Sequence, residues 1–261
     1  MDGFQKSEWQ ESPDVVQKAF RRDGYIVVRS FLDAEEVAEV YANLDRVIRE
    51  VVPTLPREQT FYEEKGDDNT LKQIQQLQKN DAYFGRLFSN SKFEQLAELL
   101  LDGPVDGRNM QYFNKPPLIG KATPPHQDGY YFMIKPTEAV TMWLAMDHVD
   151  EENGCVRYIH GSHEWGMRPH GRTQTLGFSQ GVMDYGIESD RANEVALPAQ
   201  PGDLLVHHCM TIHRADGNVS ANRTRRALGF VYYSAQAEVD EEADAAYQKR
   251  LADEMKQAGK L

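Results

Sequence analysis

The segment TPPHQDGYYF, residues 123–132, places His126 and Asp128 one residue apart. On a β-strand, residues i and i+2 point to the same face, so this imidazole and carboxylate could bind one metal ion together. A lone His-x-Asp pair often arises by chance, and most histidines in soluble proteins are exposed or hydrogen-bonded. The pair therefore predicts a metal site only if a third ligand comes from elsewhere in the chain.

A third ligand is expected in PGDLLVHHCMTIHRADGN, residues 201–218, which reads as a turn followed by a strand. Alternation along one strand would put Leu205, His207 and His213 on one face, and His208 on a more apolar face that packs against helices. We therefore prefer His213 as the third ligand and keep His207 as the second choice. Two histidines and one carboxylate with open positions form the facial triad of non-haem Fe(II) oxygenases.

Three arginines follow this segment, Arg223, Arg225 and Arg226, at the start of a predicted strand. A buried arginine beside a metal can bind a carboxylate through two parallel N–H bonds. The distal carboxylate of 2-oxoglutarate needs such a partner in an iron enzyme. The alternative is a solvated basic turn, which the sequence alone does not exclude.

The first 103 residues are predicted to be mainly helical. Ser12 and Pro13 fit an N-cap and first helical position, and a helix beginning there ends at Asp23. Asp33, with Glu36 three residues later, resembles a capping box and begins a second helix. Further helices are expected at residues 70–79 and 91–101, after a loop at residues 53–69.

From residue 104 to 234 the chain changes to short β-rich runs separated by turn residues, which is typical of a sandwich or barrel. Residues 235–261 return to a helical pattern. The expected fold is α+β, with a β-core buttressed by helices at both ends. We find no linker, so residues 1–261 are expected to form a single domain.

Composition limits the partners. The formal net charge of −12 and pI near 5.1 argue against nucleic acid or anionic lipid as the main partner. No apolar run is long enough to span a membrane, and the N-terminal segment lacks a signal-peptide pattern. Two cysteines, Cys155 and Cys209, indicate a reducing compartment, and we expect a cytoplasmic protein that is monomeric or a weak homo-oligomer.

Several segments together resemble the phytanoyl-CoA dioxygenase family, in an order that runs from about Gln111 to Tyr233. They are NKPP (114–117), PHQDGYYF (125–132), ENGCVRYIHGSHEWG (152–166), PGDLLVHH (201–208), IHRADGN (212–218) and RRAL (225–228), with EKGDDNTLKQI (64–74) upstream. The resemblance implies a double-stranded β-helix (jelly-roll) core, Fe(II), 2-oxoglutarate as co-substrate, and O2. It also implies that a C–H bond of a small-molecule substrate is hydroxylated while succinate and CO2 are released.

Position by position, the resemblance implies that His126, Asp128 and His213 are the iron ligands. Arg225 matches the arginine that binds the far carboxylate of 2-oxoglutarate. One residue is inserted before RRAL, so Arg223 is kept as the fallback for this role. Other positions that line the co-substrate pocket in relatives are matched by Gln111, Lys72 and Trp143.

The chain departs from the family pattern at two positions. Ala215 replaces a serine that relatives often carry two residues after the distal histidine, which removes one expected hydrogen bond to the co-substrate. His160 replaces the proline of a PGSH turn, and we interpret His160 and His163 as structural. Asp128 itself is retained, which favours hydroxylation over halogenation, because related halogenases replace this carboxylate with a small residue.

The substrate is the least constrained feature. The aromatic run at residues 130–132 is either core or pocket wall. Residues 166–192 are expected to form a long irregular loop, which is often a lid or binding loop, and a solvated loop is preferred over an anionic-substrate site as the explanation of its basic residues Arg168, His170 and Arg172. Two other classes of function stay open, a cupin-like metalloenzyme that needs neither Arg225 nor Lys72, and a non-catalytic jelly-roll that binds 2-oxoglutarate or a partner.

Overall fold

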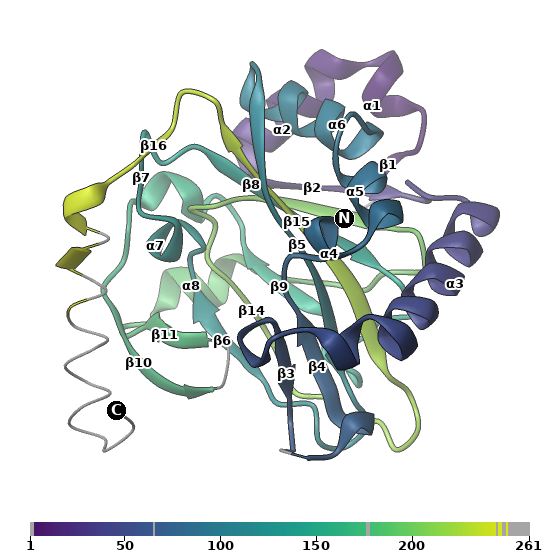
Figure 1. The fold of residues 1–261 in the computed structure, drawn as a ribbon. Helices are drawn as coiled ribbons and strands as arrows, with labels where there is room; N and C mark the ends of the chain where they lie inside the picture. Colours follow the sequence, from purple (N-terminus) through teal and green to yellow (C-terminus); the bar gives the residue numbers. More distant parts are fainter. Residues whose placement is uncertain (1–2, 65, 176–177, 244, 247–248, 250–261) are drawn as a thin grey trace.

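The computed structural model describes residues 3–64, 66–175, 178–243, 245–246 and 249. Within them the core is built from two facing β-sheets, as Figure 1 shows. In order across the larger sheet, the strands are β1 (Phe4–Gln5), β2 (Tyr25–Arg29), β13 (Leu204–His208), β8 (Ala139–Ala145), β15 (Arg225–Ser234), β5 (Val105–Lys115), β4 (Leu71–Ile74) and β3 (Thr60–Tyr62). All neighbouring pairs in this sheet are antiparallel except β1 with β2.

The smaller sheet consists of β12 (Glu194–Leu197), β9 (Val156–Ile159), β14 (His213–Ala215) and β6 (Thr123–His126), in that order. Two short pairs accompany it, β10 (His170–Thr175) with β11 (Phe178–Val182), and β7 (Ile134–Lys135) with β16 (Glu238–Val239). Apolar side chains between the sheets, including Tyr158, Leu205 and Val156, form one buried cluster. This cluster sets the spacing of the two sheets around the site described below.

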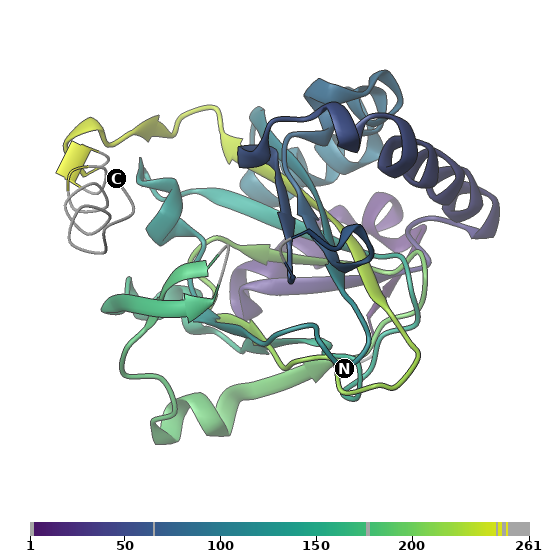
Figure 2. The same cartoon turned by 60° about the horizontal axis from the view of Figure 1, so that its bottom comes forward.

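Helices cover the outer face of the larger sheet. The helices that pack there are α1 (Glu8–Glu11), α2 (Pro13–Asp23), α3 (Ala34–Glu50), α4 (Leu77–Asn80), α5 (Ala82–Phe88) and α6 (Lys92–Leu101). Two short helices, α7 (Gly129–Phe132) and α8 (Glu188–Asn193), lie away from this face. Figures 1 and 2 show the N-terminal helices, in purple and blue, grouped on one side of the strands. Leu204, Val206 and Phe230 point into the core shared with these helices, which confirms that the apolar face of β13 faces the helical layer.

Most of the predicted helices are present. The helix beginning at Pro13 ends at Asp23, and Gly24 follows it in the left-handed conformation with φ +79°. Asp33 and Glu36 form both bonds of the predicted capping box at the start of α3. The helix expected at residues 91–101 is α6, which begins at Lys92.

Residues 70–79 are not one helix, and this prediction is wrong. Leu71–Ile74 form strand β4, which is buried along its whole length and pairs with β5 through Gln73 and Phe113. Cross-strand pairing beside an existing sheet here overrides helix propensity, which is a weak prior. The loop expected at residues 53–69 likewise contains strand β3 and three 3₁₀ turns, Val52–Thr54, Arg57–Gln59 and the start of Asp68–Thr70.

Two further predictions are corrected. Residues 166–192 are not a long irregular loop, because they contain the paired strands β10 and β11 and most of α8. A fourth 3₁₀ turn, Ser162–Trp165, ends directly before this segment. The helix predicted for the C-terminal tail does not begin at Glu238, because Glu238–Val239 is strand β16, but residues 241–243 and 245–246 are helical as predicted. The remaining positions of its predicted apolar stripe, Tyr247, Leu251 and Met255, lie outside the described residues.

Packing of α6 on the strand that carries the cavity predicts a stability effect. The Phe93 ring is fully buried and stacks on Phe230 of β15 with ring centroids 4.1 Å apart. Phe93→Ala should lower the free energy of unfolding by about 3–5 kcal/mol in chemical denaturation. The control is Glu98→Ala, an exposed position on the same helix, which should leave it nearly unchanged; a loss of under about 1 kcal/mol in Phe93→Ala would contradict this packing.

Candidate metal centre

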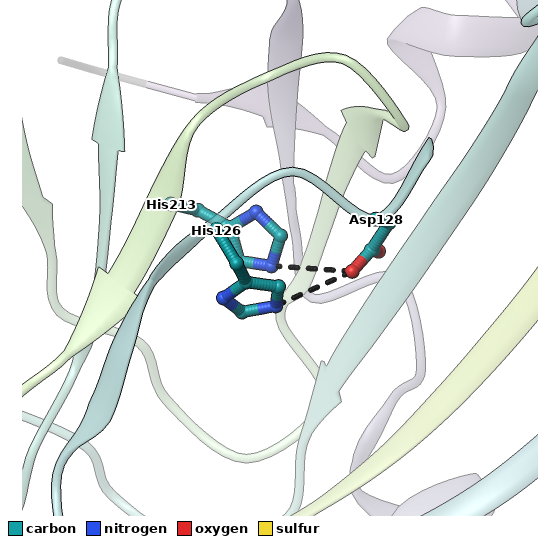
Figure 3. A group of neighbouring side chains, drawn as sticks. All are labelled: His126, Asp128 and His213. Carbon is teal, nitrogen blue, oxygen red and sulfur yellow. Dashed lines mark ion pairs between the residues drawn. The ribbon is translucent and has the colours of Figure 1, made fainter. Parts of the chain in front are cut away.

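His126, Asp128 and His213 converge at one point between the two sheets (Figure 3). His126 ends β6 and His213 begins β14, and the two residues are direct partners in the β6–β14 pairing. The Nε2 atoms of His126 and His213 lie 3.3 Å and 3.8 Å from Oδ1 of Asp128. Within the described part of the chain, these residues form the one group of metal-ligating type whose ligand atoms all fall within 4.8 Å of one another.

The local conformations differ from those expected from alternation. Strand β6 ends at His126, and Asp128 has helical backbone angles, φ −60° and ψ −35°, directly before α7. The argument that His126 and Asp128 share a strand face is therefore wrong, although the side chains still meet. His213 likewise does not share a strand with His207, because β13 ends at His208 and a turn separates it from β14.

Gln127 holds this irregular loop in place. Its side chain is fully buried, and Nε2 donates to the carbonyl oxygens of Met210 at 2.8 Å and Gly166 at 3.0 Å. Its Oε1 accepts from the backbone N–H of Arg168 at 2.8 Å. One buried amide thereby joins the loop between His126 and Asp128 to the segments before His213 and before β10.

Both histidines are oriented by backbone carbonyls. Nδ1–H of His126 donates to Pro124 at 2.8 Å, and Nδ1–H of His213 donates to Thr211 at 3.0 Å. These bonds place the proton on Nδ1 and leave the Nε2 lone pair directed at the centre, as metal-binding imidazoles require. Burial, together with the neighbouring His126 and His207, lowers the pKa of His213 well below its usual value, so this ligand is a neutral imidazole.

The two oxygens of Asp128 have different partners. Oδ1 faces the histidines, whereas Oδ2 accepts from the Thr141 hydroxyl at 2.6 Å and from Nε2–H of His207 at 3.1 Å. The Tyr158 hydroxyl donates to Nδ1 of His207 at 2.8 Å, which fixes that tautomer. Burial alone would raise the pKa of Asp128, but the neighbouring His213 and the hydrogen bond from His207 hold it well below its usual value. The carboxylate is therefore ionised and offers one free oxygen.

Arg225 occupies the opposite end of the same cavity. It is 4% exposed, its Nε has no hydrogen-bond partner among the described residues, and its guanidinium carbon lies 5.3 Å from the centre of the Trp143 ring. Burial lowers the pKa of Arg225 to about 10, so it still carries its charge at neutral pH. An unpartnered buried cation requires an anion, because burying a lone charge is costly.

The other residues expected to bind co-substrate divide into two groups. Lys72, Gln111 and Trp143 line the cavity of about 270 Å³ that also contains the three metal-ligand candidates and Arg225. Lys72 Nζ lies 3.2 Å from a carboxylate oxygen of Glu63 but without hydrogen-bond geometry. Arg223 lies outside the cavity, where it makes two bonds of 2.9 Å to Asp150, so the structure brings Arg225 and not the fallback to the site.

Several residues that support the site were not predicted from the sequence. Thr141 and Tyr158 gave no signal beyond strand alternation, and His207 was considered as a ligand and not as a partner of Asp128. Lys115, part of the NKPP segment, is buried in the cavity wall, where its Nζ donates to the carbonyl oxygen of Asp216 at 2.7 Å. Burial and the nearby Arg225 and Lys72 lower its pKa well below the usual value.

The basic residues of the 166–192 segment have other partners. Arg168 forms ion pairs of 2.9 Å with Asp184 and 2.8 Å with Asp190. His170 accepts the backbone N–H of Gln127 at 3.2 Å and stacks on Tyr130. These contacts connect the hairpin to the metal-site loop and do not single out an anionic substrate.

Comparison with known proteins agrees with this geometry. The family model described as Phytanoyl-CoA dioxygenase (PhyH) matches residues 20–227. The chain belongs to the phytanoyl-CoA dioxygenase family. It is 27% identical over 216 residues to the peroxisomal phytanoyl-CoA dioxygenase of Mus musculus, a match covering 77% of this chain and 63% of that protein. It is 25% identical over 228 residues to a probable alpha-ketoglutarate-dependent hypophosphite dioxygenase of Stutzerimonas stutzeri, covering 85% and 78%.

Solved structures show the same fold. The epimerase SnoN, in complex with Fe3+, alpha ketoglutarate and nogalamycin RO, superposes with a TM-score of 0.70 at 24% identity, covering 88% of this chain and 86% of SnoN. EctD from S. alaskensis, with 2-oxoglutarate and 5-hydroxyectoine, gives a TM-score of 0.70 at 22% identity, covering 84% and 75%. The predictions of this family and of a jelly-roll core with helical buttresses are confirmed, and the enzyme class of the family is the non-haem Fe(II) and 2-oxoglutarate-dependent dioxygenase.

The partners of Asp128 predict an effect on metal affinity. His207→Ala removes the bond to Oδ2 and should weaken metal binding by roughly 10- to 100-fold, because partners that orient a ligand contribute on this scale. Titration of the metal-free protein with Co²⁺, followed by absorption, measures the change. The control is His148→Ala, a histidine with a side chain 51% exposed, and equal affinity in the two variants would rule out this role for His207.

Proposed function

We propose that the protein is an Fe(II)- and 2-oxoglutarate-dependent dioxygenase that hydroxylates a C–H bond of a small molecule. The observation that carries this proposal is that the His126, Asp128 and His213 cluster shares one cavity with the buried Arg225, whose Nε has no hydrogen-bond partner among the described residues. When bound, iron and co-substrate supply the oxidation, in which one oxygen atom of O2 enters 2-oxoglutarate to give succinate and CO2 and the other enters the substrate.

The residues fit both groups. Two neutral imidazoles and one carboxylate are a suitable donor set for Fe(II) with positions left open for other ligands. Because Thr141 and His207 occupy Oδ2, Asp128 would hold the metal through Oδ1. Arg225 supplies the charge and N–H donors for the far carboxylate of 2-oxoglutarate.

The remaining roles follow from position in the cavity. Lys72, Gln111 and Trp143 line the part of the cavity that holds the co-substrate. The Trp143 ring contacts the Arg225 guanidinium and orients it in the cavity. Lys115, next to Arg225 in the β5–β15 ladder, adds a second nitrogen donor at this end where Ala215 lacks the expected hydroxyl. Retention of Asp128 favours hydroxylation. The substrate is not taken from the family name, because fold and cofactor are shared more widely than specificity.

We further propose a single domain and a cytoplasmic setting. Helices α2, α3 and α6 share one apolar core with the larger sheet, which supports residues 1–261 as one domain. Both cysteines are buried and unpaired, which supports a reducing compartment. Across the described ranges, no helix has the length and apolar character needed to cross a bilayer. The proposed partner is a small-molecule substrate, bound by a monomer or weak homo-oligomer.

Succinate formation tests the proposed reaction. The protein supplied with Fe(II), 2-oxoglutarate and O2 should convert 2-oxoglutarate to succinate, and Asp128→Ala should abolish this conversion and retention of iron, because the carboxylate that neutralises the metal is lost. Succinate is quantified by chromatography and iron by elemental analysis. Full activity in Asp128→Ala would contradict the ligand assignment, and iron binding without any 2-oxoglutarate consumption would favour a cupin-like metalloenzyme of another type.

The two arginines provide a matched comparison. Arg225→Gln should raise the dissociation constant for 2-oxoglutarate by at least tenfold, because the buried charge that faces the cavity is lost. Arg223→Gln, which breaks an ion pair outside the cavity, should leave it unchanged. Isothermal titration of the metal-loaded protein measures both constants. The opposite ranking would restore Arg223 as the co-substrate arginine.

A further inference from the structure

The cavity has a charged end and an uncharged end, ordered along strand β5. Lys115 and Arg225 are partners in the β5–β15 ladder and mark the charged end. Lys121, a cavity-lining cation, belongs to the same end, because the preceding Gly120 packs directly against Lys115. Lys72 also lies here, one residue before Gln73, which pairs with Phe113. The cationic groups that suit a dicarboxylic co-substrate are therefore gathered together.

The uncharged end continues along the same face of β5. After Phe113, the next residues on this face are Gln111 and Asn109, which pair with Gly229 and Val231 of β15. Val231 in turn pairs with Thr141, the residue that holds Asp128. Asn109 therefore lies in the same cross-strand row as Thr141. The two residues are two strands apart, which corresponds to about 10 Å.

Hydrogen bonds fix the side-chain amides of this end, which we call the amide wall (Gln73, Gln75, Asn109 and Gln111). Nε2 of Gln73 donates to Oε1 of Gln111, and Nδ2 of Asn109 donates to Oε1 of Gln75, both at 2.7 Å. Oδ1 of Asn109 accepts the backbone N–H of Gln76 at 3.0 Å. Among the described residues, Nε2 of Gln111 and Nε2 of Gln75 have no hydrogen-bond partner, so the wall offers N–H donors to the cavity.

No uncompensated charge faces this end among the described lining residues. Asp128 is the one carboxylate in the cavity wall, and it is committed to the metal centre. The remaining cation, Arg214, is neutralised by Glu194, at 2.7 Å and 2.8 Å, and by Asp216 at 2.6 Å. An ammonium, carboxylate or phosphate group would therefore lose its hydration at the amide wall without gaining a partner of opposite charge.

The size of the cavity limits what it encloses. Its volume of about 270 Å³ lies just below the usual range of roughly 300–1,000 Å³ for ligand pockets, and the co-substrate must share it. We propose that the amide wall binds an uncharged, polar small molecule whose oxygen acceptors, such as hydroxyl or amide carbonyl groups, are recognised by the free N–H donor of Gln75, while Gln111, nearer the charged end, is kept for the co-substrate. This inference rests on the proposed function, which supplies the reacting centre beside the wall.

Binding of simple probes tests the inference. The protein is loaded with Zn²⁺ and 2-oxoglutarate, and ligand-observed NMR measures the affinities of sorbitol and N-methylacetamide, of butylammonium and butyrate, and of propionyl-CoA. The two uncharged probes should bind, and the charged probes and the thioester should not. Binding of butyrate or the thioester without the uncharged probes, or of no probe at all, would overturn the proposal.

An isosteric variant locates the binding. Gln75→Glu keeps an oxygen for Asn109 but replaces the N–H donor by a negative charge. This substitution should raise the dissociation constants of the two uncharged probes by roughly tenfold and should allow butylammonium to bind. The control is Gln95→Glu, the same change at an exposed position on α6, which should alter nothing; equal losses in both variants would refute the role of the wall.

The outcome is separable from that of the proposed function. A protein that consumes 2-oxoglutarate but binds no uncharged probe would leave the dioxygenase assignment intact and contradict this inference. A protein that binds the uncharged probes but never consumes 2-oxoglutarate would contradict the dioxygenase assignment and leave the amide wall as a binding site.

Discussion

The carboxylate of Asp128 has to present one oxygen to a metal and keep the other occupied. Thr141 and His207 meet this requirement by donating to Oδ2, and Tyr158 holds His207 in the tautomer that can donate. If Oδ2 were free, the carboxylate could bind through both oxygens and close a position that the co-substrate or O2 needs. The rest of the site depends on this division between the two oxygens.

Each of the two sheets contributes different residues to the metal centre. The smaller sheet contributes both histidines as direct partners across β6 and β14, whereas the larger sheet contributes Thr141, His207 and Arg225. Asp128 bridges them from the loop after β6. The apolar cluster between the sheets fixes their separation, and Gln127 fixes the loop, so the ligands are preorganised by parts of the chain far apart in sequence.

The sequence predicted which residues form the site better than it predicted their backbone conformation. The capping box of α3, the apolar face of β13 and the convergence of His126, Asp128 and His213 were all predictable, because they rest on periodicity and on a family pattern. The helical angles of Asp128 and the break between β13 and β14 were not, since both depend on tertiary hydrogen bonds such as those of Gln127.

The sequence also does not reveal which strands pair with each other. Strand β4 was expected to be helical because its propensity is helical, and only its place beside β5 makes it a strand. The amide wall exists because that strand brings Gln73 next to Gln111. Similarly, the choice between Arg223 and Arg225 turns on which side chain the sheet buries, and three neighbouring arginines carry no such information.

The account is tested most directly by adding 2-oxoglutarate to the Fe(II)-loaded protein under anaerobic conditions while recording the visible absorption spectrum. Chelation of ferrous iron by the co-substrate at an open, monodentate-carboxylate site predicts a weak visible band that saturates at one 2-oxoglutarate per iron. If iron is bound and no band develops at saturating 2-oxoglutarate, the site does not accept the co-substrate and the central claim is wrong.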